Sequence, residues 1–259
     1  MIAQLARFSN DCYHILKAPT GSKTAILRDL VLSGRRKMGF QIAFFDRPTL
    51  NQFFREIFAR QHYYFRAETD SPLVLDCGAN LGMASIYFKW LYPKCRVQAF
   101  EPDPTTFQLL ERNIAENNLG VGAHNCALWD QEGEVDLFVD PSNPGTGLMS
   151  TDPSRLEGKP IKVPARRLSD FIRAPVDFLK LDVEGAEHRV IRDLAQTGKL
   201  LAVQQMVVEY HHRIGQHKSC LADFLGTLER GGFQYQIQAS LFPETSKDAF
   251  QDILIRAYR

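Results

Sequence analysis

One short stretch constrains the fold of this chain more than any other. Residues 74–77 are apolar apart from Asp76, and the turn-forming residues Gly78, Asn80 and Gly82 follow at once. A second apolar segment, 97–100, ends on Glu101. A strand with a glycine-rich turn, followed by a strand that ends in an acidic residue, is typical of the nucleoside-binding half of an open α/β sheet. We therefore expect a cofactor that contains a nucleoside to bind at residues 78–82.

The identity of the residue at position 80 indicates which cofactor this is. The dinucleotide fingerprint requires glycine where the pyrophosphate presses on the backbone, and Asn80 stands there instead. Asp76 adds negative charge, which would repel a diphosphate and suits a cation. Adenosine joined to a positive centre describes S-adenosylmethionine, so we predict this cofactor. An NAD-dependent oxidoreductase and a catalytically inactive cofactor-binding module are the alternatives.

Each candidate cofactor-binding residue is assigned one contact. We expect Gly78 and Gly82 to let the backbone approach the ligand closely, with Asn80 between them. Asp76 would bind the methionine ammonium group, or simply be a turn residue at a strand end. Glu101 would accept the ribose hydroxyls, or else face the dipole of the next helix. Asp130 follows the third strand and would contact the adenine amino group, or serve as a turn residue.

Candidate catalytic residues lie after two later strands. Lys180, Asp182 and Glu184 belong to segment 176–187, and Glu209 and His211 end the following strand. Ligands bind at such strand ends in open α/β sheets. His211 is a plausible general base and Glu209 is predicted to orient it or the acceptor. Lys180 lies in an apolar run, so we expect it to pair with Asp182 or Asp76.

An Asp/Glu/His group of this kind also suits a divalent metal. We favour acceptor binding at these strand ends and assign no metal ligand from the sequence.

Strands and helices alternate from residue 72 onward, which predicts an α/β fold with a parallel sheet. Two final strands without a helix between them predict an antiparallel edge, as in methyltransferase-type sheets. The expected strands are 73–76, 96–101, 121–128, 134–139, 176–182, 203–210, 233–238 and 253–258. The expected helices are 81–91, 104–118, 186–197 and a helix capped by Ser219 that runs to Arg230.

Residues 1–66 are predicted to form a mainly helical N-terminal extension, separate from a catalytic domain over 67–259. A helical stretch is expected around Leu27 and residues 30–32, then a short strand over 41–45. Thr49 is the expected cap of a helix whose apolar residues recur at three- and four-residue spacings up to Phe58. The aromatic segment 40–66 and the loop 143–150 are predicted to cover the acceptor.

Composition narrows the function classes. The 259 residues carry a net charge of only +1, which argues against nucleic acid and anionic lipid as partners. The sequence also lacks the N-P-P-Y motif that many base-modifying enzymes of this fold carry at a strand end. This absence argues against methylation of nucleic acid. Five scattered cysteines predict reduced thiols in a cytosolic protein, and the sequence lacks both a secretory signal and a run long enough for membrane insertion.

Taken together, these motifs resemble the FkbM family of S-adenosylmethionine-dependent methyltransferases. The resemblance rests on residues 75–82, 99–103, 127–133, 180–187 and 208–211, in the order that the family shows. It implies a class I methyltransferase fold with a Rossmann-like seven-stranded sheet and helices on both faces. It also implies O-methylation of a hydroxyl on a small-molecule or carbohydrate acceptor, such as a sugar, glycolipid, polysaccharide or polyketide.

Overall fold

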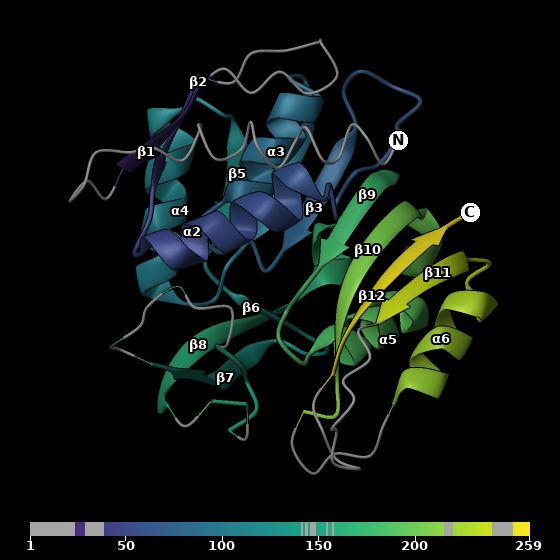
Figure 1. The fold of residues 1–259 in the computed structure, drawn as a ribbon. Helices are drawn as coiled ribbons and strands as arrows, with labels where there is room; N and C mark the ends of the chain where they lie inside the picture. The colour runs from purple at the N-terminus through teal and green to yellow at the C-terminus, as the bar shows by residue number, and fades with distance from the viewer. Residues whose placement is uncertain are drawn as a thin grey trace.

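The structure of the protein is a computed structural model. It describes residues 24–28, 39–140, 149–153, 158–214, 220–239 and 251–259, with single positions between 141 and 158. At its centre lies a seven-stranded sheet in the order β11-β12-β10-β9-β3-β4-β5 (Figure 1). Its strands are β3 (Leu73–Cys77), β4 (Arg96–Phe100), β5 (Val121–His124), β9 (Val176–Leu181), β10 (Val203–His212), β11 (Gln234–Ala239) and β12 (Gln251–Tyr258).

The pairing within this sheet confirms the predicted fold class. The five strands from β10 to β5 pair in parallel, whereas β12 pairs antiparallel with both β10 and β11. Chain order reverses at β3, which has β4 on one side and β9 on the other. Ligands bind beyond the strand ends at such a switch point. The loop after β3 and the segment after β9 are therefore neighbours.

Alternating apolar residues give the large sheet two buried faces. Val74, Phe178 and Val207 pack on one face with α3 (Met83–Leu91) and with α2 (Arg47–Phe54). The next residue of each strand points to the other face, against α5 (Glu187–Gln196) and α6 (Leu221–Arg230). Period-two alternation with apolar residues at both phases requires helices on both faces. Helix α4 (Pro104–Glu116) packs beside β5.

The predicted strand over 121–128 is wrong, because the chain changes sheets within it. Residues after β5 enter β6 (Ala127–Trp129), which belongs to a small sheet in the order β6-β8-β7. Asn125 marks the break, since its amide donates to the carbonyls of Glu101 and Pro102. Strands β7 (Gly133–Val139) and β8 (Lys159–Arg167) complete this sheet, which lies below the large one in Figure 1.

The described part of the N-terminal segment departs from its prediction at Leu27, and residues 30–32 of the expected helical stretch lie outside the described residues. Leu27 lies in a strand, β1 (Thr24–Arg28), which pairs antiparallel with β2 (Gly39–Ala43). A short apolar run does not distinguish a helix from a strand, and pairing with β2 decides the outcome. Helix α2 forms as expected, but Asp46 caps it by accepting from the Thr49 N–H at 2.9 Å. A π-helical turn, η2 (Arg55–Ala59), extends it.

Three further features complete the fold. Short 3₁₀ helices η3 (Leu168–Phe171) and η4 (Lys199–Ala202) precede β9 and β10, respectively. Helix α6 begins after Cys220, and the predicted cap Ser219 lies outside the described residues, as does most of the predicted cover loop 143–150. In the described part of the chain, no helix has the length and hydropathy of a membrane span.

Candidate active site

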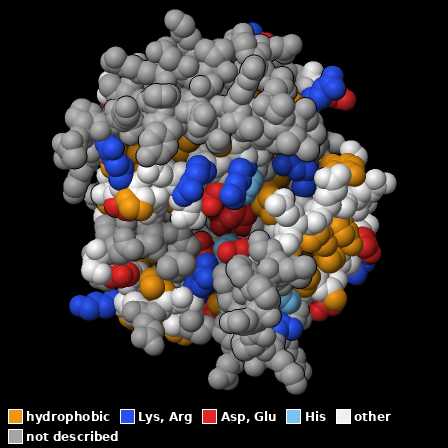
Figure 2. Space-filling view, viewed as in Figure 1, with side chains coloured by type: hydrophobic (Ala, Val, Ile, Leu, Met, Phe, Trp, Pro, Cys, Tyr) orange, Lys and Arg blue, Asp and Glu red, His pale blue; other side chains and the backbone are white. Residues whose placement is uncertain are grey.

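A cavity of about 420 Å³ opens at the switch point of the large sheet. Its lining runs from the glycine-rich loop and Glu101, past the ends of β9 and β10, to one wall formed by the segment 49–63. This volume is within the range of small-molecule binding sites. Figure 2 shows acidic side chains gathered in a hollow on this face, with Lys and Arg side chains around them.

The glycine-rich loop is held in a conformation that other residues adopt with difficulty. Gly78 has φ +82°, and a Cβ atom there would lie 1.7 Å from the backbone oxygen of Asp182. Asn80 also has positive φ, at +49°, and its N–H donates to Glu101 Oε2 at 2.9 Å. Gly82, at φ +93°, is the N-cap of α3 and lies behind the cavity lining. The loop therefore fits against both Asp182 and Glu101.

Glu101 lies at the end of β4, at the boundary between cavity and core. Its second oxygen, Oε1, accepts from the Asp103 N–H at 2.9 Å. Burial raises the pKa of Glu101 to about 8, although the backbone donors at Asp103 and Asn80 oppose this shift. Since a carboxylate accepts several hydrogen bonds, both oxygens retain capacity for a ligand in the cavity.

Besides Gly82, two further predicted cofactor-binding residues lie outside the cavity lining. Asp76 is fully buried behind the loop, where Oδ2 accepts from Ser85 Oγ at 2.6 Å, and it does not line the cavity. Asp130 also lies outside the lining and pairs with Arg189 and Arg192 of α5. This arrangement gives no support to the adenine contact expected of Asp130, because Asp130 follows β6, which belongs to the small sheet.

Lys180 ties the two sides of the switch point together. Its ammonium donates to the Gly78 carbonyl at 2.7 Å and lies 3.2 Å from Asp182 Oδ2 and 3.7 Å from Asp76 Oδ1. Burial would lower the pKa of Lys180, but the two carboxylates outweigh burial and raise it. The expected pairing is therefore made with both aspartates, and Lys180 stays charged while it positions the glycine loop.

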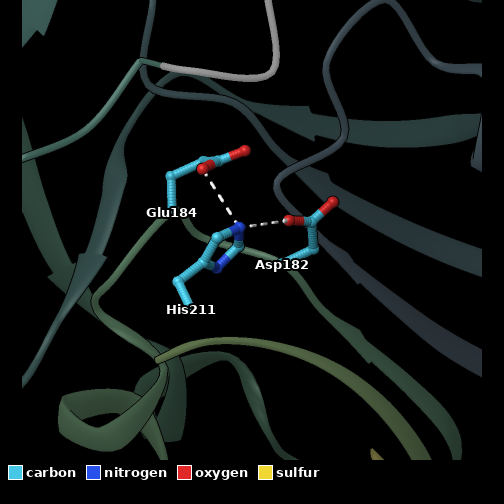
Figure 3. A group of neighbouring side chains, drawn as sticks. All are labelled: Asp182, Glu184 and His211. Atoms are coloured by element: carbon cyan, nitrogen blue, oxygen red, sulfur yellow. Dashed lines mark ion pairs between the residues drawn. The ribbon is translucent and has the colours of Figure 1, made fainter. Parts of the chain in front are cut away.

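His211 lies among carboxylates at the end of β10. Its Nε2 is 3.0 Å from Glu184 Oε2 and 4.0 Å from Asp182 Oδ1, as Figure 3 shows. On the other side, Nδ1 donates to Glu187 Oε1 at 2.8 Å. Burial opposes the charged ring, but Glu184 and Glu187 raise the pKa of His211 well above its usual value. The ring is therefore a hydrogen-bond donor on both sides in this arrangement, rather than a free base.

Glu187 orients His211, whereas Glu209 faces the N-terminal segment. The same Glu187 oxygen accepts from the backbone N–H groups of Val183 and Gly185, so Glu187 fixes the loop as well as the ring. Glu209 instead accepts from the Tyr63 hydroxyl. Burial raises the pKa of Glu209 to about 8. This hydrogen bond joins the N-terminal wall of the cavity to β10 across 146 residues of sequence.

Comparison with known proteins agrees with this geometry. The model of the methyltransferase FkbM domain matches residues 76–235, which is more than half of the chain. The chain belongs to the FkbM family of methyltransferases. Members of this family are S-adenosylmethionine-dependent enzymes, so the predicted family, class of reaction and cofactor are confirmed.

Individual FkbM relatives match over different lengths. Methyltransferase 1 of Beauveria bassiana is 33% identical over 162 residues, covering 54% of this chain and 65% of that protein, just under two thirds of its length. The 31-O-demethyl-FK506 methyltransferase FkbM of Streptomyces tacrolimicus is 25% identical, covering 80% and 90%. A crystal structure of FkbM from Methylobacillus flagellatus has 18% identity and a TM-score of 0.49, covering 80% and 48%.

The cavity has the features that the FkbM cofactor needs. Small residues of the loop at 78–80 leave space beside the backbone, and Glu101 offers acceptor oxygens at the end of the second strand. Apolar side chains of Phe100, Cys126 and Leu128 form an adjacent surface that suits a purine ring. S-adenosylmethionine therefore fits this half of the cavity, where it would supply an activated methyl group.

The sequence assigned no individual role to three contributors to this FkbM site, although Glu187 and Tyr63 lie in segments that it singled out. Glu187 has the position of an ordinary acidic residue in the first turn of a helix. Tyr63 belongs to an aromatic cluster that is typical of core packing. Arg155, whose Nη2 lies 3.1 Å from Glu184 Oε2, comes from a loop without a motif. Only the strand-end position of Glu184 and His211 hints that partners exist.

Proposed function

We propose that this protein transfers a methyl group from S-adenosylmethionine to a hydroxyl group of a small-molecule or carbohydrate acceptor. The proposal rests on the observation that a single cavity is continuous between the two groups of residues. It connects Glu101 and the glycine loop with the polar group of Asp182, Glu184 and His211. Such a cavity holds two substrates close enough for direct transfer, so proximity and orientation supply most of the catalysis.

The acceptor would occupy the half bounded by the N-terminal segment. Gln52, Phe53 and Glu56 line this half together with Tyr63 and Glu209. A mixture of carboxylates, an amide and aromatic rings suits an acceptor with several hydroxyl groups on an apolar frame. The name of the Streptomyces relative, 31-O-demethyl-FK506 methyltransferase, agrees with methylation at oxygen.

Removal of the hydroxyl proton falls to the strand-end carboxylates in this proposal. Asp182 and Glu184 are partly exposed to the cavity, whereas both ring nitrogens of His211 already face carboxylates. We assign proton acceptance to Asp182 or Glu184 and a supporting role to His211, which holds Glu184 in place. Lys180 remains a positioning residue.

Calorimetric titration with S-adenosylmethionine, S-adenosylhomocysteine and NAD tests the cofactor half, and a screen of glycosides and other hydroxyl compounds tests the acceptor half. We expect the adenosyl ligands to bind and NAD to fail. Binding without turnover on any hydroxyl acceptor would support the inactive binding module. Failure of the adenosyl pair to bind would overturn the proposal.

A His211→Ala variant tests the acceptor half separately from the cofactor half. We expect lower turnover with cofactor affinity nearly intact, because His211 pairs with the strand-end carboxylates of Glu184 and Glu187. Unchanged turnover would remove His211 from the mechanism.

A further inference from the structure

The strand-end group has a second feature that methyl transfer by itself does not require. Asp182, Glu184 and His211 each offer one ligand atom, and these atoms all lie within 4.8 Å of one another. In Figure 3 the three side chains point toward a common centre from the end of β9 and from β10. All three line the cavity, so the group is reachable from solvent.

The separations from the His211 ring match those of ligands around one small cation, and the ligand atoms of Asp182 and Glu184 lie within 4.8 Å of each other. Two atoms that bind the same ion at about 2.1 Å lie no more than about 4.2 Å apart. His211 Nε2 is 3.0 Å from Glu184 Oε2 and 4.0 Å from Asp182 Oδ1, which satisfies this limit for both pairs. Asp182 uses its other oxygen for Lys180, so Oδ1 remains directed toward the ring.

The side chains around this group resemble the outer shell of a metal site. Histidine ligands usually give their second ring nitrogen to a carboxylate, which fixes the ring and the tautomer. Glu187 does this for His211 at 2.8 Å, and Glu187 is itself fixed by two backbone N–H groups. Arg155 holds Glu184 in the same way, at 3.1 Å. His211 and Glu184 are therefore each held by a partner outside the group.

The local charge also favours a cation. Four carboxylates lie within 4.0 Å of a ring nitrogen of His211, from Asp182, Glu184, Glu187 and Asp252. Among the described ion pairs, these four carboxylates meet only two permanent cations, Lys180 and Arg155. A cation that binds Nε2 would displace the proton held there, and with the imidazole then neutral the group has an excess of two negative charges, which a divalent ion would balance.

We propose that Asp182, Glu184 and His211 form a binding site for a divalent cation, with Asp252 as an additional ligand on the open side. Two or three carboxylates and one imidazole suit Mn²⁺ or Mg²⁺, which prefer oxygen ligands and keep open positions for water or substrate. This assignment reverses the preference for acceptor binding over metal that the sequence supported.

The role of the ion described next rests on the proposed function. In that function, the ion would act on the acceptor hydroxyl. A bound cation acts as a Lewis acid, which lowers the pKa of a coordinated hydroxyl and fixes its position. It would therefore hold the acceptor oxygen beside the cofactor half of the cavity. Metal binding and methyl transfer are separable properties, since the first is measured without cofactor or acceptor.

The test is binding of Mn²⁺ to the full chain after removal of metals with a chelator, followed by calorimetry and by the electron paramagnetic resonance of free Mn²⁺. We expect one Mn²⁺ per chain. Asp182→Asn and Glu184→Gln keep the shape of the side chains and should each weaken binding by about tenfold or more. Glu187→Gln should weaken it by about tenfold, as outer-shell substitutions do.

His212→Ala is the matched control, because His212 is the next residue of β10 and does not line the cavity. It should bind Mn²⁺ like the unaltered protein. Circular dichroism of every variant checks that the fold is retained, and the isosteric substitutions keep the test valid if His211 variants do not fold. No binding at millimolar Mn²⁺, or binding that Asp182→Asn and Glu184→Gln leave unchanged, would overturn the metal site. Mn²⁺ binding without activity on any hydroxyl acceptor would instead overturn the proposed function alone.

Discussion

The two halves of the cavity are assembled over very different distances along the chain. In the cofactor half, the bond from Asn80 to Glu101 spans 21 residues and joins two consecutive strands. In the acceptor half, the bond from Tyr63 to Glu209 spans 146 residues. A short separation fixes the geometry through one strand-turn-helix-strand unit, whereas a long one depends on the whole sheet. Relatives can therefore keep the first half and change the second.

The largest effect is expected where the two halves touch, at Gly78. A methyl group on Gly78 would lie 1.7 Å from the Asp182 backbone oxygen, which cannot move without shifting the end of β9. We expect Gly78→Ala to lower the free energy of unfolding by about 3 kcal/mol or more, and to abolish cofactor binding. Urea denaturation and cofactor titration measure both effects.

Gly198→Ala is the control for Gly78, since Gly198 also has positive φ, at +72°, but a Cβ atom there meets nothing within 4 Å. Backbone strain without a clash should cost about 1 kcal/mol. Equal losses in the two variants would show that the halves do not approach each other as closely as described.

A second prediction isolates the acceptor half through Tyr63. Tyr63→Phe removes the donor to the partly buried Glu209 and leaves the ring in place. An acceptor left without its donor away from water costs about 1–3 kcal/mol, so kcat/KM for the acceptor should fall about tenfold. Cofactor affinity should not change. Tyr64→Phe alters an exposed neighbour and should leave both quantities unchanged, so equal effects of the two variants would contradict the assignment.

The same contrast explains what the sequence could predict. The alternation of strands and helices, the glycine loop and Glu101 follow from local patterns, and all lie where expected. Asp130 could not be placed from the sequence, because the strand at 121–128 divides between two sheets at Asn125. Glu187 and Tyr63 could not be assigned either, since their partners are set by the packing of β10 against distant segments.

A third prediction uses the pKa of Glu101 to probe the cofactor half. Burial raises this pKa to about 8, so the carboxyl is largely neutral at pH 7 and becomes a full acceptor as pH rises. If the ionised form binds the ribose, cofactor affinity should increase by about tenfold between pH 7 and pH 9. Glu101→Gln should bind more weakly and remove this pH dependence. Calorimetry across the range measures it, and a rise that persists in Glu101→Gln would assign it to another group.

The smallest effect is expected at Asp130, which the sequence alone would place at the adenine ring. Its carboxylate pairs with Arg189 and Arg192, and burial, which would raise the pKa, is outweighed by these two guanidinium groups. Asp130→Asn should leave cofactor affinity unchanged. It should cost at most about 1 kcal/mol of stability, because partly exposed ion pairs contribute little. Calorimetry beside Glu101→Gln makes the comparison direct. Weakened binding in Asp130→Asn would mean that β6 comes closer to the cofactor than the present geometry allows, and the boundary of the cofactor half would then extend into the small sheet.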